Sequence, residues 1–350
     1  MHAVSRRRIL VSSAIDDETR GTNDVTTLLT GGNGWVPSFV LRQLAQRGER
    51  VISYDLMPVD DVLREHLDDA VANVTFVHGD VTDGEHLLDI AQEAGVTRII
   101  HTAAITPRLW REQKEPRRVI DVNLGGTINA LEAARALPGF ERFVYVGSGA
   151  VWGSGHTGET IDEDAPSRTT NLYGITKYAS ERIAMRYKEL FGLDIVSMRP
   201  ANVYGPMERD TPGYVGATEL REMLRVLAAG EELRVASLDG PYHDWTFVED
   251  IAEGIVRAWA TPNLPHDVYS ITCGRQYSIG EMLAAFKRAW PEIEYRLVPE
   301  DEANTPLRDA PRGPRPKNDR ILADFGWAPS TPLDEGVAIY LNWVRANGPQ

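Results

Sequence analysis

One stretch decides the fold: VTTLLTGGNGWVP, from Val25 to Pro37. Its first six residues combine β-branched and leucine side chains, which is typical of a buried strand. Three glycines follow, and a helical pattern begins after them. Glycines at such a turn let the backbone approach a pyrophosphate, and the helix N-terminus supplies free N–H groups and a partial positive charge. The stretch therefore predicts a dinucleotide site at the start of a parallel α/β sheet.

This glycine-rich turn is expected to contact the dinucleotide through Gly31, Asn33, Gly34, Trp35 and Val36. The last position of the usual glycine pattern is Pro37 instead. Proline is tolerated in the first turn of a helix, so we expect the anion site to remain, with a local difference in how helix and strand pack.

Asp55 ends the second expected strand, 21 residues after Gly34. A carboxylate at this spacing accepts hydrogen bonds from the adenosine ribose and repels a 2′-phosphate. No lysine or arginine follows it in the next three residues, Leu56 to Pro58. The sequence therefore favours NAD over NADP.

From Val25 to Gly205, short apolar runs alternate with longer helical patterns, which predicts a doubly wound parallel sheet of the Rossmann type. The expected strands are 25–30, 50–55, 74–79, 98–103, 141–147 and 193–199, with helices at 124–136 and 173–191. Residues 206–350 are expected to form a smaller C-terminal α/β substrate lobe, beginning with a helix near 218–229, and the two lobes can interleave. Residues 1–24 are expected to be an irregular extension, and the proline-rich run 299–316 a long connection that serves as a lid or a linker.

Composition excludes several classes of function. The chain has 350 residues and a formal net charge of -14, which argues against a nucleic-acid partner. No apolar run is long enough to span a bilayer, and the single cysteine, Cys273, fits a reducing compartment, so we expect a cytoplasmic protein. The eight histidines show no metal-ligand spacing, so no metal site is expected.

Tyr173 and Lys177 lie four residues apart, which places a phenol and an ammonium on one helical face. A tyrosine with a pKa of about 10 becomes a base at neutral pH only where a cation favours the phenolate. Lys177 is a candidate for that cation. Taken alone, the pair is equally typical of an ordinary amphipathic helix.

Several ordered motifs accompany the glycine-rich turn, Asp55 and the Tyr173–Lys177 pair. They are Gly79-Asp80-Val81, His101-Thr102-Ala103-Ala104, Asn123, Ser148 to Gly153, Arg199 to Pro206 and Phe325-Gly326-Trp327. Together they resemble the extended short-chain dehydrogenase/reductase family, in its NAD-dependent epimerase/dehydratase branch, over nearly all of residues 25–345.

The resemblance implies a role for each motif. Asp80 and Val81 would line the adenine, Ala103 and Ala104 would pass beneath the cofactor, and Asn123 would belong to the same site. Lys177 would bond the nicotinamide ribose. Ser148 would bind the reacting oxygen, while Tyr173 exchanges its proton as hydride moves. Similar proteins pair through the helices at 124–136 and 173–191, which implies a homodimer.

The reaction is narrowed by the residues that follow Ser148. Family members that eliminate water or carbon dioxide have an acidic residue there, whereas this chain has Gly149 and Ala150, which cannot transfer a proton. An epimerase and a net dehydrogenase remain, and the pattern of the C-terminal lobe favours the epimerase slightly. A non-catalytic NAD-sensing protein is a third hypothesis, which the retained Ser148, Tyr173 and Lys177 disfavour.

The residues expected to bind the substrate favour different classes of substrate. Asn202 matches a position that contacts the nucleotide diphosphate in the family, which supports a sugar nucleotide. His243, however, stands where the family has a diphosphate-binding arginine, and a largely neutral imidazole binds anions weakly. Arg308 and Arg312 both lie near the other phosphate-binding position. A sugar, a sugar acid or another polyhydroxylated alcohol therefore remains open beside a sugar nucleotide.

Overall fold

The computed structural model describes residues 25–106, 108–211, 213–214, 218–305 and 313–349. At its centre lies a seven-stranded parallel sheet with the strand order β11-β7-β5-β4-β1-β2-β3. Its strands are β1 (Thr26–Thr30), β2 (Arg50–Asp55), β3 (Val74–His78), β4 (Arg98–His101), β5 (Arg142–Val146), β7 (Ile195–Pro200) and β11 (Val268–Ile271). The predicted doubly wound Rossmann-type sheet is confirmed.

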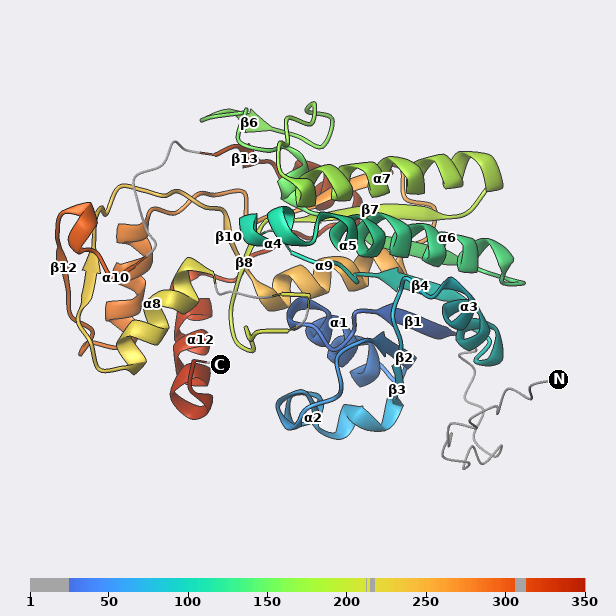
Figure 1. Ribbon diagram of the computed structural model, residues 1–350, viewed down its shortest axis with the longest axis horizontal. Coiled ribbons are helices and arrows are strands. Elements are labelled where there is room, and N and C mark those ends of the chain that lie inside the picture. The colour runs from blue at the N-terminus through green and yellow to red at the C-terminus, as the bar shows by residue number, and fades with distance from the viewer. Residues whose placement is uncertain (1–24, 107, 212, 215–217, 306–312, 350) are drawn as a thin grey trace.

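Helices cover both faces of the sheet (Figure 1). Helices α1 (Trp35–Gln46) and α9 (Val248–Ala260) pack together on one face, and α3 (Gly84–Glu93), α6 (Gly126–Ala136) and α7 (Leu172–Phe191) lie on the other. Shorter helices, α2 (Asp61–Leu67), α4 (Leu109–Lys114) and α5 (Pro116–Ile120), fill the connections. Because both faces are covered, β1 and β5 are buried at every position.

All six strands expected from the sequence form, with ends that shift by two residues at most. The two long helices also form, but the first is preceded by a π-helical turn, Asp121–Gly125, which the sequence pattern did not predict. The longer helix, α7, begins where the Asn171 side chain accepts a hydrogen bond from the Gly174 N–H at 2.8 Å. It ends at Gly192, which adopts a left-handed conformation with φ of 67°.

Residues after Gly205 contribute to both parts of the molecule. Strand β11 and helix α9 belong to the central sheet and its cover. The remainder forms a smaller lobe, seen at the left of Figure 1. Its elements are α8 (Glu219–Ala228), β9 (Leu233–Val235), α10 (Ile279–Ala289), β12 (Tyr295–Leu297) and α12 (Leu333–Asn347), with α11 (Asp319–Phe325) beside β11.

Two short parallel pairs lie outside the central sheet. Strand β8 (Asn202–Tyr204) pairs with β10 (Trp245–Phe247), and β6 (Thr160–Ile161) pairs with β13 (Arg315–Pro316). The expected extension 1–24 and residues 306–312 of the expected connection lie outside the described residues. No helix in the described part of the chain is long and apolar enough to cross a membrane.

Candidate active site

A cleft of about 470 Å³ lies at the carboxyl ends of the sheet strands, where parallel α/β sheets bind ligands. It brings together segments that are far apart in the sequence. Those named by the sequence prediction are Gly31, Gly34, Trp35, Val36, Asp55, Asp80, Val81, Ala103, Ala104, Ser148, Tyr173, Lys177 and Asn202.

The glycine-rich turn forms one wall of the cleft. Gly31 has a φ of +74°, and a Cβ on it would lie 2.9 Å from the Cα of Ala103, so only glycine fits there. Helix α1 begins after Gly34 with no side-chain cap and no acidic residue in its first turn. Its first N–H groups are therefore available to an anion in the cleft, which fits a dinucleotide diphosphate.

Asp55 lies at the end of β2, beside this turn. Its carboxylate accepts hydrogen bonds from the N–H groups of Asn33 and Met57, at 2.9 and 2.8 Å. Burial raises the pKa of Asp55, and these two N–H groups partly offset the rise. The carboxylate still has free lone pairs that can accept ribose hydroxyls.

Two of the expected cofactor residues lie behind the walls of the cleft. The side chain of Asn33 accepts from Ser53 and donates to the Met57 carbonyl, so it ties the turn to β2. The buried amide of Asn123 receives the Ile105 N–H at 2.7 Å and donates to the Ile105 carbonyl at 3.0 Å. Both side chains therefore position backbone that lines the cleft, and neither lines it.

Ser148 and Tyr173 meet because two turns pack closely. Ser148 follows β5 and opens a 3₁₀ turn, Gly149–Val151, where its Oγ accepts the Ala150 N–H at 3.1 Å. Gly174 lets the first turn of α7 approach, since a Cβ there would lie 2.7 Å from the Ala150 carbonyl oxygen. Tyr173, in that first turn, and Ser148 then line the same cleft.

Lys177 lies one helical turn further along α7 and is buried. Its Nζ donates to the Val146 carbonyl at 2.7 Å and lies 6.0 Å from the ring centre of Tyr173. Burial lowers the pKa of Lys177 to about 7. Burial raises the pKa of Tyr173, and the Ser148 hydrogen bond lowers it in part. In this arrangement the ammonium binds a backbone carbonyl instead of the phenol oxygen.

The expected substrate-binding residues are only partly assembled. Asn202 is exposed and lines the cleft. Trp245 is the strand partner of Asn202, whereas His243, two residues earlier, pairs with Tyr277, and its Nε2 faces the Glu219 carboxylate at 3.7 Å. Burial lowers the pKa of His243, and the charge of Glu219 partly offsets this. Arg308 and Arg312 lie outside the described residues.

Among the cleft-lining residues that the sequence prediction did not name are Arg118 on α5, Glu219 on α8 and Tyr214. The only available signal was that Tyr214 and Glu219 fall in or just after an irregular stretch between a strand and a helix. Nothing in the periodicity indicated Arg118.

Residues 206–211 and 213–214, the 206–214 segment, connect the smaller lobe to the glycine-rich turn. The Trp35 indole donates to the Pro206 carbonyl at 2.7 Å, and Arg209 donates to the Asn33 carbonyl at 2.9 Å. The Trp35 and Tyr214 rings lie 5.8 Å apart. The segment thus lies against the turn that would hold a cofactor diphosphate.

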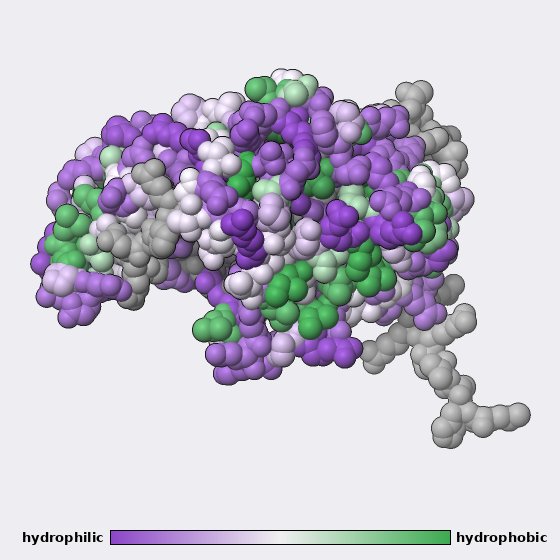
Figure 2. Space-filling view, turned by 90° about the horizontal axis from the view of Figure 1, so that it is seen from above, coloured by the Kyte–Doolittle hydropathy of each residue, from purple (hydrophilic) through white to green (hydrophobic). Residues whose placement is uncertain are grey.

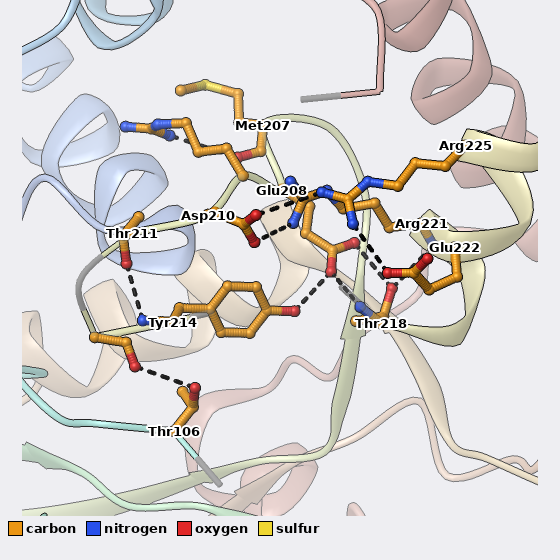
Figure 3. Close-up of polar contacts among 12 residues, drawn as sticks. Thr106, Met207, Glu208, Asp210, Thr211, Tyr214, Thr218, Arg221, Glu222 and Arg225 are labelled. Atoms are coloured by element: carbon orange, nitrogen blue, oxygen red, sulfur yellow. Dashed lines mark hydrogen bonds and ion pairs between the residues drawn. The ribbon is translucent and has the colours of Figure 1, made fainter. Parts of the chain in front are cut away.

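Buried Glu208 anchors the other side of this segment (Figure 3). Its carboxylate accepts the hydroxyls of Tyr214 at 2.6 Å, Thr218 at 2.9 Å and Tyr340 at 3.0 Å, and also the Thr218 N–H at 2.7 Å. Burial raises the pKa of Glu208, and these hydrogen bonds lower it in part. The start of α8 is therefore fixed relative to the segment.

No group of three or more metal-ligating side chains gathers within the described ranges. The ionisable side chains of the cleft itself are spread over several strands and helices. The arrangement is that of a dinucleotide cleft with an adjacent serine, tyrosine and lysine.

Comparison with known proteins identifies the family of this chain. A family model described as NAD dependent epimerase/dehydratase family matches residues 27–280. The UDP-glucose 4-epimerase of Mycolicibacterium smegmatis is 28% identical over 320 residues, which cover 91% of this chain and 98% of that protein. The dTDP-glucose 4,6-dehydratase of Xanthomonas campestris is 26% identical, over 92% of this chain and 93% of its own length.

Solved structures agree with these matches. The UDP-glucose 4-epimerase of Thermus thermophilus, in complex with NAD, has a TM-score of 0.76 and 26% identity, covering 92% of this chain and all (100%) of that one. The UDP-glucose 4-epimerase of Bifidobacterium longum, in complex with NAD+ and UDP, has a TM-score of 0.77 and 25% identity. The match covers 93% of this chain and 99% of that one. This chain belongs to the NAD dependent epimerase/dehydratase family of enzymes.

Proposed function

We propose that the protein transfers hydride between NAD and a secondary alcohol or ketone of a sugar or sugar-nucleotide-like substrate, as an epimerase does. The observation that supports this most is the convergence of Ser148, Tyr173 and Lys177 in the cleft that also contains the glycine-rich turn and Asp55. A carbinol gives up hydride readily only as its oxygen becomes anionic, so a base and a hydrogen-bond donor must meet beside the hydride acceptor.

Two features of the cleft fit NAD, one at the diphosphate and one at the adenosine ribose of the cofactor. The uncapped start of α1 would hold the diphosphate, and Asp55 would accept the ribose hydroxyls. When bound, NAD would accept the hydride at its nicotinamide ring and return it.

The chain's own residues would then handle the proton. Ser148 Oγ accepts the Ala150 N–H, and its one hydroxyl hydrogen would turn from Tyr173 to the substrate oxygen when a substrate is bound. Tyr173 would take the substrate proton. Because burial raises the pKa of Tyr173, the phenolate needs the charge of a protonated Lys177.

The epimerase version is supported by the 206–214 segment. Trp35 and Arg209 hold this segment against the glycine-rich turn, which would hinder departure of the cofactor between turnovers. An epimerase needs NAD to stay bound, whereas a net dehydrogenase must release NADH. Relatives and solved structures whose names include UDP-glucose 4-epimerase support the same version.

A net dehydrogenase acting on a non-nucleotide sugar, a sugar acid or another polyhydroxylated alcohol is the second candidate. One observation favours it: His243 faces Glu219 at the position where the resemblance leads one to expect a diphosphate-binding arginine. Gly149 and Ala150 beside Ser148 oppose elimination reactions for either candidate.

The two candidates are separated by incubating the purified protein with NAD and a panel of sugars, sugar acids, alditols and sugar nucleotides. The epimerase predicts an inverted product without net NADH, measured by product chromatography and absorbance of NADH. Stoichiometric growth of NADH would contradict the epimerase and support the dehydrogenase.

We also infer that the chain forms a homodimer in the cytoplasm. Large hydrophobic side chains are exposed on the elements next to and within α7: Leu109 and Trp110 on α4, Ile120 on α5 and Ile175 on α7. Figure 2, which looks onto the side that carries α7 in Figure 1, shows hydrophobic groups gathered among hydrophilic ones. The single cysteine, Cys273, supports a reducing compartment.

A further inference from the structure

Glu219 places a carboxylate at the cleft, on a helix start whose backbone is anchored. It is the first residue of α8 and lines the cleft directly after Thr218, whose hydroxyl accepts the Arg221 N–H at 3.2 Å. Thr218 is also tied to buried Glu208 through both its N–H and its hydroxyl. Glu208 is itself held by the hydroxyls of Tyr214 and Tyr340. The start of α8, and with it the backbone of Glu219, is therefore anchored through the two bonds between Thr218 and Glu208 (Figure 3).

The Glu219 carboxylate lies beside the imidazole of His243, which is mainly neutral. The Nε2 of His243 lies 3.7 Å from a Glu219 oxygen, and within the described residues this nitrogen has no hydrogen-bond partner. The imidazole packs edge-on against the Trp245 ring, with ring centres 4.9 Å apart. Desolvation favours its neutral form, so the pair as a whole is negative.

No other charged side chain that lines the cleft lies on α8 or on the β8–β10 pair. Asp55 and Asp80 follow β2 and β3, Arg118 lies on α5, and Lys177 lies on α7. Glu219 is thus the one charged side chain that α8, β8 and β10 contribute to the lining of the cleft.

We propose that Glu219 selects the substrate class, by accepting hydroxyl groups of an uncharged polyhydroxylated substrate and repelling a nucleoside diphosphate. This rests on the proposed hydride-transfer function and deepens it. A carboxylate accepts hydrogen bonds from sugar hydroxyls, and the exposed amide of Asn202, which lines the same cleft, can donate and accept them. The same carboxylate at a few ångströms from a phosphate is repulsive.

The first test uses UDP, which cannot be turned over. The NADH-loaded protein is titrated with UDP to about 20 mM, followed by the fluorescence of bound NADH. We expect the wild type to be half-saturated at a UDP concentration above about 1 mM. In Glu219→Gln this concentration should be about fivefold lower or more, because one like charge is removed. Glu222→Gln is the matched control: Glu222 lies on the same helix but pairs with Arg225, and we expect a change below about twofold. Half-saturation of the wild type below 1 mM, or no change in Glu219→Gln, overturns the proposal.

The second test uses the substrate panel described above. Turnover confined to uncharged, non-nucleotide members, with a KM that rises in Glu219→Gln more than kcat falls, supports the proposal. Turnover of a UDP-sugar overturns it and leaves the hydride-transfer function intact. The hydride-transfer function fails separately, if replacement of Tyr173 leaves turnover unchanged.

Discussion

His101 is a neutral imidazole enclosed between strands and helix α6, behind the cleft. Its Nδ1 lies 2.8 Å from the Thr30 hydroxyl and its Nε2 3.1 Å from the Thr127 hydroxyl, and its ring stacks on Tyr145. Burial, and then the charge of Lys177, lower the pKa of His101 to about 3. A neutral ring at this buried place avoids repulsion from the charge of Lys177.

The low pKa of His101 predicts acid sensitivity of the fold. An unfolded histidine has a pKa of 6.5 and the folded one about 3, so the unfolded chain binds the extra proton between these values. Stability is therefore full above pH 6.5 and falls as the pH drops toward 3, by about 2 kcal/mol at pH 5 from this residue. Urea unfolding at pH 7 and pH 5 checks this. Between pH 7 and pH 5, the free energy of unfolding of His101→Asn should fall by about 2 kcal/mol less than that of the wild type. Equal falls in the two proteins would refute this role of His101.

Residue spacing sufficed to predict most of the cleft. Gly31, Asp55, Ser148, Tyr173 and Lys177 all lie in it, because each follows a strand or opens a helix whose position local pattern indicates. The contacts that each side chain makes could not be predicted from residue spacing. The bond from Lys177 to the Val146 carbonyl and the approach of Glu219 to His243 depend on side-chain packing between distant segments, about which periodicity carries no information.

At the scale of elements, the 206–214 segment depends on one buried carboxylate. Glu208 accepts the hydroxyls of Tyr214, Thr218 and Tyr340, which would be left without their acceptor in Glu208→Ala. We expect that variant to lower the free energy of unfolding by about 3 kcal/mol. Glu208→Gln keeps one acceptor oxygen and should lose less.

Urea denaturation of both variants measures this, with Glu222→Ala as the control. Glu222 is paired with Arg225 at the surface, so its removal should change stability by about 0.5 kcal/mol or less. A loss below about 1 kcal/mol in Glu208→Ala would contradict an anchoring role for this carboxylate.

The elements themselves divide into predictable and unpredictable ones for a physical reason. Strands covered on both faces are continuous apolar runs, and α7 has a clear cap at each end, so their ranges follow from the sequence. Strand β11 has four residues and joins the sheet next to β7, a pairing across some seventy positions that no local pattern encodes. The π-helical turn before α6 similarly reflects tertiary packing of Asn123.

At the scale of the whole molecule, the exposed hydrophobic residues of α4, α5 and α7 predict self-association. Ile175 is 46% exposed on α7, and α5 packs against both α4 and α7, so these side chains lie on neighbouring elements. We expect the wild type to have the mass of two chains by light scattering and Ile175→Asp to have the mass of one. Leu322→Asp is the control, since Leu322 is 52% exposed on α11. A dimeric Ile175→Asp protein would argue against this interface.

The central claim is that Tyr173 exchanges the proton while hydride moves to and from NAD. Tyr173→Phe removes one hydroxyl from the cleft and leaves the glycine-rich turn and Asp55 in place. The most direct measurement is turnover of this variant on the substrate identified from the panel, together with its affinity for NAD. We predict an NAD affinity within about threefold of the wild type and a kcat lower by about 10²-fold or more. A Tyr173→Phe protein that binds NAD and turns over at the wild-type rate would contradict the account.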